Sequence, residues 1–350
     1  MYKQTSAFTA QPPGKKAGTL YPPFKRPEGE EASLWDELTN LRTSGSTGKP
    51  KVFRVKAEQM IRSAHLTCDF LGLKKGDRAL LCMPLQYIGA RMMVVRTLVA
   101  GLNLMVREPS GHPLAGAETP PRFAAMLPLQ VYNSLQIPIE KERLMQIEIL
   151  IIGGGAIDPE LEQELRDFPN VVYSTYGMTE TLSHIALRRL NGPGASAYYT
   201  PFPSIRLSLT EGGTLVIDAD FIPGAPLVTN DLAELLPDGR FRVLGRKDNC
   251  INSGGIKLQI EQLEEKLRPL IPVPFAVTSI ADARLGEAVV LLVEKGVRID
   301  KLKDEISSVL TAYERPGYIF EVKSIPLAGN GKTDRAACRE LTRNRRRTAL

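Results

Sequence analysis

Apolar residues in the first half of the chain alternate between helical spacing and short continuous runs. Residues 57–72 and 88–101 each carry apolar positions at helical spacing and end on glycine. Further short helices are expected at residues 33–41, 130–135 and 161–166. The continuous runs suit buried strands, and they are ALLCM (79–83), NLMV (103–106), FAAML (123–127), IEILIIG (147–153) and VVYST (171–175). This alternation predicts an α/β domain built on a mostly parallel sheet.

The pattern changes near Pro203 to short strands separated by turn residues. The stretches SIRLSL, GTLVI and RFRVL favour a small antiparallel β subdomain. Beyond Gly245, helical and extended segments alternate again in a smaller α+β unit. Its expected helices and strands lie at residues 260–267, 275–280, 288–294, 300–313 and 318–322. We place the domain boundary between Lys247 and Asp248, which gives an N-terminal domain of residues 1–247 and a C-terminal domain of residues 248–350.

Composition changes this picture little. The chain has 350 residues, of which 43% are apolar and 24% charged, so it is neither disordered nor collagen-like. It has no apolar run of membrane-spanning length, and its N-terminus has no apolar core typical of an export signal. The four cysteines lie far apart without a CxxC motif, which argues against a disulfide framework or a zinc site. We therefore expect a cytoplasmic protein.

The net charge of +6 is concentrated at the C-terminus. Residues 339–350 hold five arginines and one glutamate. We interpret this stretch as a solvated tail after the last helix. Nucleic-acid binding is the alternative, but no aromatic residues are interleaved with the arginines, so we expect no nucleic-acid partner.

The strongest chemical feature is the stretch Thr43-Ser44-Gly45-Ser46-Thr47-Gly48-Lys49-Pro50-Lys51. Its glycines let backbone N–H groups approach phosphate oxygens, its hydroxyls donate hydrogen bonds, and its lysines supply charge. It is not a Walker A loop, because that motif needs glycine at position 43 and serine or threonine at position 50. It favours a polyphosphate-binding loop, with an ordinary surface loop as the alternative.

Two further features directly follow predicted strands, where ligands collect in α/β sheets. In Tyr176-Gly177-Met178-Thr179-Glu180, the tyrosine ring suits a purine and the glutamate is a hard oxygen ligand for magnesium. The turn Gly153-Gly154-Gly155-Ala156 allows close backbone approach to a flat ligand. In each case the alternative is a plain turn that binds nothing.

Three charged residues stand out nearer the C-terminus. Asp231 has the chemistry to accept from a ribose diol, and Arg246 to donate to one. Lys332 is flanked by glycines in the stretch GNGKTDR, which suits a lysine that must reach an acidic group. A solvated lysine in a turn is the alternative.

Together these segments resemble, in order, the core motifs of the adenylate-forming superfamily of acyl-CoA synthetases, luciferases and peptide-synthetase adenylation domains. The motifs are STGKPK, GGGA, YGMTE, TND, GRKDNCINSGGIK and NGKTDR, and they span Thr43 to Arg335. Within the superfamily, the short length and the sequence YGMTET followed by SHIALRR look most like the o-succinylbenzoate–CoA ligases of menaquinone biosynthesis.

The resemblance implies roles for individual residues around ATP. Ser44, Ser46, Thr47 and Lys51 would hold the β- and γ-phosphates within a loop that also includes Thr43, Gly45 and Gly48. Glu180, with Thr47, would bind Mg²⁺. Asp231 and Arg246 would hold the ribose hydroxyls. Gly154, Gly155 and Tyr176 would frame the adenine. The other expected ATP-binding residues of these two motifs are Ala156, Gly177, Met178 and Thr179.

The resemblance also implies a mobile C-terminal domain that completes two half-reactions. Lys332 would bridge the substrate carboxylate and the α-phosphate during adenylation, and would then move away to admit the thiol of coenzyme A. Asp248 would be the hinge, and the turn Ser253-Gly254-Gly255 would line the pantetheine channel. The sequence indicates no general base for the thiol.

Two departures and two candidate residues concern the acyl pocket. Only 42 residues precede the phosphate loop, so part of the acyl and CoA surfaces is expected to be reduced or supplied otherwise. Tyr87 stands where many relatives have histidine. His184 is a candidate substrate contact or a satisfied buried histidine, and Arg91 is a candidate partner for a second substrate carboxylate or a surface arginine.

The expected function is that of an ATP-dependent acid–thiol ligase that uses ATP, Mg²⁺ and coenzyme A, with o-succinylbenzoate as the acid. Another aryl- or acyl-CoA ligase, or a non-catalytic adenylate-binding relative, is the alternative. The sequence does not predict the oligomeric state.

Overall fold

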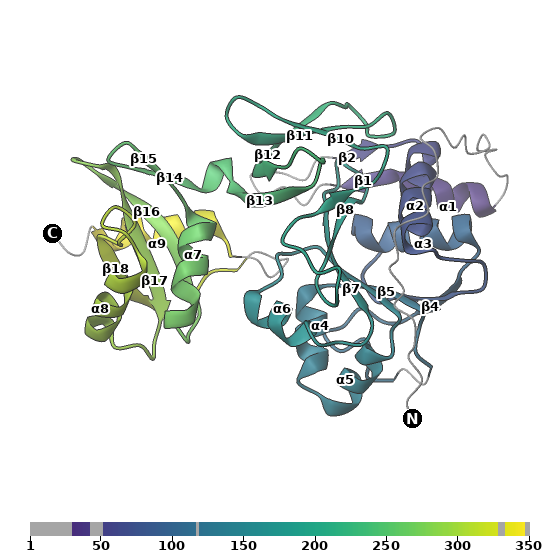
Figure 1. Cartoon of the computed structure of the whole chain (residues 1–350), viewed down its shortest axis with the longest axis horizontal. Helices are drawn as coiled ribbons and strands as arrows, with labels where there is room; N and C mark the ends of the chain where they lie inside the picture. Colours follow the sequence, from purple (N-terminus) through teal and green to yellow (C-terminus); the bar gives the residue numbers. More distant parts are fainter. Residues whose placement is uncertain (1–29, 43–51, 117–118, 328–332, 347–350) are drawn as a thin grey trace. The chain divides into compact units, whose positions relative to one another are not determined.

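The structure, a computed structural model, describes residues 30–42, 52–116, 119–327 and 333–346 (Figure 1). It divides into two compact units. The first consists of Met1–Arg206, Ile217–Leu227 and Pro237–Arg240, and the second of Leu207–Val216, Val228–Leu236 and Phe241–Leu350. The second unit thus takes in strands that precede the boundary proposed at Lys247 and Asp248. The boundary at Lys247 and Asp248 was proposed for the functional domains. This division into compact units does not test it, so it stays a prediction.

The first unit is built on a seven-stranded sheet in the order β4-β3-β5-β6-β7-β8-β9. The strands from β4 to β7 are parallel, and β8 and β9 continue the sheet in antiparallel pairing. The parallel strands are β3 (Arg78–Leu81), β4 (Asn103–Val106), β5 (Phe123–Met126), β6 (Ile149–Ile152) and β7 (Val171–Gly177), and the others are β8 (His184–Arg189) and β9 (Thr200–Pro201). All five predicted parallel strands are confirmed, and β8 was not predicted.

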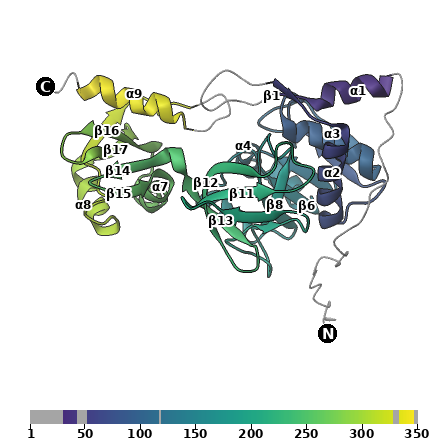
Figure 2. The ribbon, with the colours of Figure 1, turned by 90° about the horizontal axis from the view of Figure 1, so that it is seen from above.

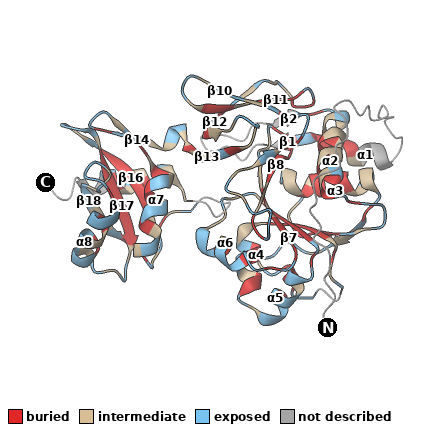
Figure 3. Cartoon of the chain, viewed as in Figure 1, coloured by how far each residue is buried: buried red, intermediate tan, exposed pale blue. Residues whose placement is uncertain are grey.

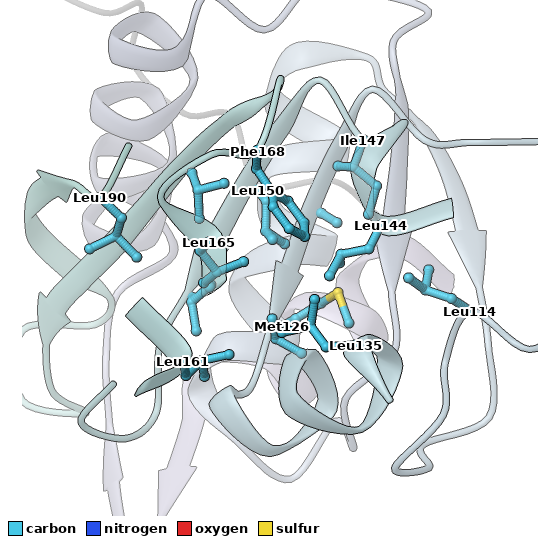
Figure 4. Close-up of a cluster of buried hydrophobic side chains, with 14 of the residues drawn as sticks. Leu114, Met126, Leu135, Leu144, Ile147, Leu150, Leu161, Leu165, Phe168 and Leu190 are labelled. Atoms are coloured by element: carbon cyan, nitrogen blue, oxygen red, sulfur yellow. The ribbon is translucent and has the colours of Figure 1, made fainter. Parts of the chain in front are cut away.

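The predicted strands of this sheet are uninterrupted apolar runs because helices cover both of its faces. Alternate residues of the strands, such as Met126 and Leu150, form one buried cluster with residues of α4, α5 and α6 (Figure 4). The opposite face meets α2, where Phe70 contacts the ring of Tyr173 at 6.0 Å between centroids. These helices are α2 (Ala57–Leu71), α3 (Ile88–Ala100), α4 (Pro128–Leu135), α5 (Pro138–Met145) and α6 (Pro159–Leu165).

Local sequence fixes where the two long helices end. Gly72 and Gly101 follow α2 and α3 with φ angles of 63° and 65°, a left-handed conformation that glycine adopts without steric cost. The first helix, α1 (Glu30–Thr39), begins three residues before the predicted start and leads into the strand pair β1 (Asn40–Arg42) and β2 (Val52–Arg54). Neither strand of this pair was predicted, because each has only three residues.

A four-stranded sheet follows in the order β10-β11-β12-β13. The three predicted antiparallel strands are confirmed, and β12 supplies the fourth. Their bounds are β10 (Arg206–Leu209), β11 (Thr214–Asp218), β12 (Leu227–Leu235) and β13 (Phe241–Arg246). The longest strand, β12, was missed because threonine, asparagine, aspartate and glutamate interrupt its apolar pattern.

The C-terminal residues form a five-stranded sheet in the order β15-β14-β17-β16, with β18 parallel to β17. Alternate residues of β17 enter two different clusters, Val289 on one face and Val290 on the other. Helices α7 and α8 cover the first face and α9 covers the second (Figure 2). The middle residues of β16 and β17 are therefore buried (Figure 3).

The elements of this part follow one another in α+β order. They are the 3₁₀ turn Lys247–Asn249, β14 (Cys250–Ser253), β15 (Ile256–Gln259), α7 (Ile260–Leu267), the 3₁₀ turn Arg268–Leu270, β16 (Phe275–Asp282), β17 (Gly286–Glu294), α8 (Ile299–Val309), β18 (Tyr318–Val322) and α9 (Arg335–Arg346). No described helix is long and apolar enough to cross a membrane.

The prediction of a solvated tail from Arg339 is wrong for its first eight residues. They belong to α9, whose Cys338 and Thr342 are fully buried. Arg339 and Arg343 alternate with these buried residues along an amphipathic helix, which is why the arginine-rich sequence was taken for a tail. Arg335 at the start of α9 pairs with Glu264 on α7, with Nη2 and Oε2 2.7 Å apart.

We expect replacement of Leu150 by alanine to destabilise the first unit. Leu150 is fully buried at the centre of the parallel sheet, so removing its side chain leaves a cavity and should cost about 2–5 kcal/mol. Urea unfolding measures this loss. Leu129 on α4 is 60% exposed, so Leu129→Ala is the matched control. Equal effects of the two substitutions would contradict the assignment of this core.

Candidate active site

Two predicted ligand-binding motifs meet at the carboxyl edge of the parallel sheet. Strands β6 and β7 are neighbours, with Ile152 opposite Ser174 in the register. The glycine turn 153–155 leaves the end of β6, and Tyr176 lies near the end of β7. Because parallel strands end on the same edge, the two motifs lie side by side, where the chemistry of such sheets is usually located.

The glycine turn is required by the approach of neighbouring residues. A Cβ atom on Gly153 would lie 2.2 Å from Oγ1 of Thr175, and one on Gly154 would lie 2.8 Å from Leu127. Gly154 also has a φ angle of 78°, which favours glycine. The turn therefore presents backbone rather than side chains beside Tyr176.

A second tyrosine supports Tyr176. The rings of Tyr176 and Tyr199 are 5.9 Å apart, and the Tyr199 hydroxyl lies 2.8 Å from Oγ of Ser174. The guanidinium of Arg188 lies over the Tyr199 ring at 5.7 Å and is held by two hydrogen bonds to Glu162, of 2.8 and 2.7 Å. This pair joins α6 to β8. The sequence analysis missed these supporting residues, because nothing in their spacing connects α6 with β8.

The YGMTE segment forms a tight turn between β7 and β8. A Cβ atom on Gly177 would lie only 2.3 Å from the carbonyl oxygen of Ser183, so the turn closes directly on glycine. Oγ1 of Thr181 accepts from the N–H of Met178 at 2.9 Å and donates to the Ser183 carbonyl at 2.7 Å. Leu182 has a φ angle of 65°, an uncommon conformation for a residue with a side chain.

This turn leaves the Glu180 carboxylate exposed. Among the described residues no three histidine, cysteine, aspartate or glutamate side chains form a metal cluster. A single accessible carboxylate fits magnesium, which is usually bound by one or two carboxylates together with substrate phosphates and water. The chemistry of the donor is thus compatible with the predicted metal. Thr47, the other predicted ligand, lies outside the described residues.

His184 is buried in a hydrogen-bonded cluster. Its Nε2 lies 3.0 Å from Oγ1 of Thr67 and its Nδ1 lies 3.3 Å from Oγ of Ser183. Burial, and then the nearby Arg96 guanidinium, hold the pKa of His184 well below its ordinary value. The imidazole is therefore neutral. This geometry favours the alternative of a satisfied buried histidine, and a direct contact with substrate stays a prediction.

Arg91 is committed to the backbone. Its Nη1 donates to the carbonyl oxygens of Glu37 and Asn40, each at 2.6 Å, and its Nε donates to Leu85 at 2.8 Å. It thus caps the C-terminal end of α1, where unpaired carbonyls attract a cation. These contacts favour a structural role for Arg91, and its pairing with a second substrate carboxylate stays a prediction. Tyr87 is 47% exposed and precedes α3 at the carboxyl edge.

In the second unit the structure brings Asp231 and Arg246 together. They are cross-strand partners on β12 and β13, and Nη1 of Arg246 lies 3.6 Å from Oδ1 of Asp231. Arg246 also contacts both carboxylate oxygens of Asp248, at 3.0 and 3.3 Å. The predicted ribose pair and the predicted hinge therefore share one guanidinium, a connection that the sequence analysis did not foresee.

The remaining predicted residues are partly described. The turn Ser253-Gly254-Gly255 is the hairpin between β14 and β15, with φ angles of 61° and 85° at its two glycines. Leu327 and Thr333, which flank Lys332 in the sequence, form an antiparallel bridge. Lys332 itself and the phosphate loop Thr43–Lys51 lie outside the described residues, so their roles stay predictions.

A mostly parallel sheet with a glycine turn, a tyrosine pair and an exposed carboxylate at its carboxyl edge defines an α/β nucleotide-binding enzyme. Comparison with known proteins names the family. The model of the AMP-binding enzymes matches residues 3–219, and the chain belongs to this family. The predicted class, an adenylate-forming enzyme of the acyl-CoA synthetase type, is confirmed at this level.

The chain is similar to several characterised or solved relatives. It is 27% identical to a probable 2-succinylbenzoate–CoA ligase of Mycobacterium tuberculosis, over 85% of this chain and 82% of that protein. It is 35% identical to an acyl-CoA synthetase (AMP-forming)/AMP-acid ligase II-like protein from Dyadobacter fermentans. The structural match covers 90% of this chain and 95% of that one, with a TM-score of 0.59.

A third relative supports the fold alone. It is the o-succinylbenzoate CoA synthetase of Bacillus subtilis, solved with its acyl-adenylate intermediate. It is 22% identical, with a TM-score of 0.72, and the match covers 85% of this chain and 68% of that one.

Replacing Gly177 by alanine should disrupt the YGMTE turn. The added methyl would clash with backbone atoms of Ser183 and His184, which cannot rotate away, so we expect a loss of about 2–3 kcal/mol in the free energy of unfolding. Gly89 is the matched control, because its Cβ would meet only the end of Met83 at 3.7 Å. If Gly177→Ala and Gly89→Ala are equally tolerated in urea unfolding, the described turn is wrong.

Stability should depend on pH through His184. Below pH 6.5 the unfolded chain binds a proton at this histidine and the folded chain does not, so stability falls as the pH falls. The loss should grow steadily as the pH is lowered from 6.5 towards 5. Urea unfolding of the native protein and of His184→Asn over this range measures the difference. Parallel pH profiles would show that His184 is not held neutral.

Proposed function

We propose that this chain is an ATP-dependent acid–thiol ligase that adenylates o-succinylbenzoate and transfers the acyl group to coenzyme A. The observation that carries the chemistry is the convergence of the glycine turn, Tyr176 and the exposed Glu180 at one edge of the sheet. The similarity to 2-succinylbenzoate–CoA ligase over most of both chains supports the choice of acid.

The glycine turn and Tyr176 suit the adenine of ATP. The backbone of residues 153–155 and the ring of Tyr176 would enclose a flat base, because Gly153 and Gly154 leave no side chain in the way. Asp231 and Arg246 would exchange hydrogen bonds with the ribose hydroxyls. Arg246 would then divide its donors between the ribose and Asp248.

The phosphate half depends on predicted residues. The hydroxyls and lysine of Thr43–Lys51 would bind the β- and γ-phosphates, and Glu180 with Thr47 would hold Mg²⁺. When bound, the metal neutralises phosphate charge. Lys332 would stabilise the negative charge that builds up as the substrate carboxylate approaches the α-phosphorus.

Two half-reactions follow from these roles. A carboxylate oxygen of the acid forms a bond to the α-phosphorus while the bond to pyrophosphate breaks, which gives the acyl-adenylate. The deprotonated thiol of coenzyme A then attacks the acyl carbon, and AMP leaves with the bonding electron pair. Residues 248–350 would rotate between the two steps about Asp248, removing Lys332 and bringing the turn 253–255 to the pantetheine.

The test of this function is pyrophosphate release from ATP with a panel of acids, measured with and without coenzyme A. We expect release with o-succinylbenzoate, and a thioester only when coenzyme A is present. Benzoate, a fatty acid and several amino acids complete the panel. Release with another acid alone would retain the ligase and reject this substrate. No release with any acid, while ATP still binds, would instead indicate a non-catalytic relative.

Lys332→Ala should abolish most of the adenylation activity. Removing a charge that acts mainly in the transition state is expected to lower kcat by about 100-fold or more while ATP binding changes little. Lys323 is an exposed lysine of the same unit outside the predicted site, so Lys323→Ala is the control. Adenylation that survives in Lys332→Ala would exclude the assigned role.

A further inference from the structure

Arg96 on α3 is a buried cation with few partners. The residue is 1% exposed. Its Nη2 donates to Oγ of Ser183 at 2.6 Å, and its Nη1 lies 3.9 Å from the sulfur of Met93. Its Nε is buried without any hydrogen-bond partner. A guanidinium has five N–H donors, so most of its capacity is unused.

No carboxylate compensates this charge within the described part of the chain. Every ion pair found there involves other residues, and the one titratable neighbour that acts on Arg96 is the Cys68 thiol. Burial lowers the pKa of Arg96 to about 10, so the side chain is still charged at neutral pH. An uncompensated buried charge is costly, and proteins usually keep one only where it acts on something.

Other arginines of the same unit show the contrast. Arg91, five residues earlier on the same helix, donates to backbone carbonyls. Arg188 makes a two-point contact with Glu162. Each therefore has acceptors that explain its place in the fold, whereas Arg96 has one serine hydroxyl and a thioether.

The surroundings of Arg96 add donors rather than negative charge. The Arg96 N–H occupies a lone pair of Ser183 Oγ, which leaves the serine O–H to donate to Nδ1 of His184. Nε2–H of the neutral His184 then donates to Thr67, whose hydroxyl faces the Ser63 carbonyl. In this series of hydrogen bonds each group donates to the next group farther from the guanidinium, and none of the groups is negatively charged. The cluster therefore carries one net positive charge.

The cluster is attached directly to the turn of the candidate active site. Ser183 is the residue whose carbonyl accepts from Thr181, and Thr181 in turn holds the Met178 N–H beside Glu180. The buried positive charge is therefore bonded to the same turn that carries the exposed Glu180.

We propose that Arg96 is a specificity-determining residue that binds a second carboxylate of the acid that becomes adenylated. The Nε–H and a neighbouring N–H of the guanidinium form a planar fork that matches the two oxygens of a carboxylate. One carboxylate of a diacid loses its charge on forming the acyl-adenylate, and the other keeps its charge and pairs with Arg96. This inference rests on the proposed function, and it assigns to Arg96 the role expected of Arg91.

The experiment compares o-succinylbenzoate with two acids that each lack one of its carboxylates, 4-oxo-4-phenylbutanoate and 2-butanoylbenzoate. Pyrophosphate release gives kcat/KM for each acid with native protein, Arg96→Met, Arg96→Lys and Arg91→Met. We expect native protein to prefer the diacid by about 100-fold or more, because a buried donor left unpaired penalises the analogue. Arg96→Met should lose this preference because its kcat/KM falls for the diacid and not for the two monoacids. Arg96→Lys should keep part of the preference.

The Arg91 control and the result that would overturn the proposal differ in their pattern across the acids. Arg91→Met should lower activity toward all accepted acids by a similar factor, because Arg91 supports the fold. The same uniform loss in Arg96→Met would overturn the proposal and make Arg96 a structural residue. A native protein that adenylates monoacids as well as diacids would also overturn it, while leaving the ligase function intact.

Binding of the diacid in the absence of ATP tests the role of Arg96 independently of the proposed ligase activity. Methionine fills a similar volume without charge, so Arg96→Met should unfold at the same or a higher temperature than native protein. The diacid should raise the Tm of native protein and leave that of Arg96→Met unchanged. This result would establish that Arg96 binds a carboxylate of the diacid even if no acid released pyrophosphate, in which case only the proposed function would fail. A diacid that shifts both proteins equally, or neither, would reject it.

Discussion

The close approach of backbone at the carboxyl ends of β6 and β7 is the constraint on which the rest of the structure depends. Gly153 must admit Oγ1 of Thr175, and Gly177 must admit the carbonyl of Ser183. A larger residue at either position would separate the glycine turn from Tyr176 or force the turn after β7 open. The glycines thus serve packing first, and the exposed backbone and carboxylate of the site are consequences of that packing.

Charge in the interior is organised by the same turn. The strands around it are apolar on both faces, so every polar group placed among them needs a partner. Arg91 and Arg188 have acceptors that join separate elements, α1 to α3 and α6 to β8. Arg96 reaches the Ser183 hydroxyl beneath the turn and the sulfur of Met93, and among the described residues no carboxylate balances its charge.

Much of the fold could be predicted because its strongest elements are continuous in the sequence. The strands from β3 to β7 are apolar runs, and α2 and α3 end on glycines. Elements that depend on partners were missed, among them β12, whose polar residues interrupt its apolar pattern, and β8. The amphipathic helix α9 was also not predicted, because its sequence contains five arginines. Its buried side is recognised only from its contact with the C-terminal sheet.

The sequence by itself determined the class of enzyme, the order of its motifs and the positions of its glycines, because these depend on local backbone conformation and on residue chemistry. Only the tertiary structure decided which arginines have partners. Arg91 and Arg96 lie on one helix and look equivalent in the sequence, yet one meets backbone carbonyls and the other a buried serine. Their difference arises from which elements pack against each face of α3, and residues far apart along the chain supply those contacts.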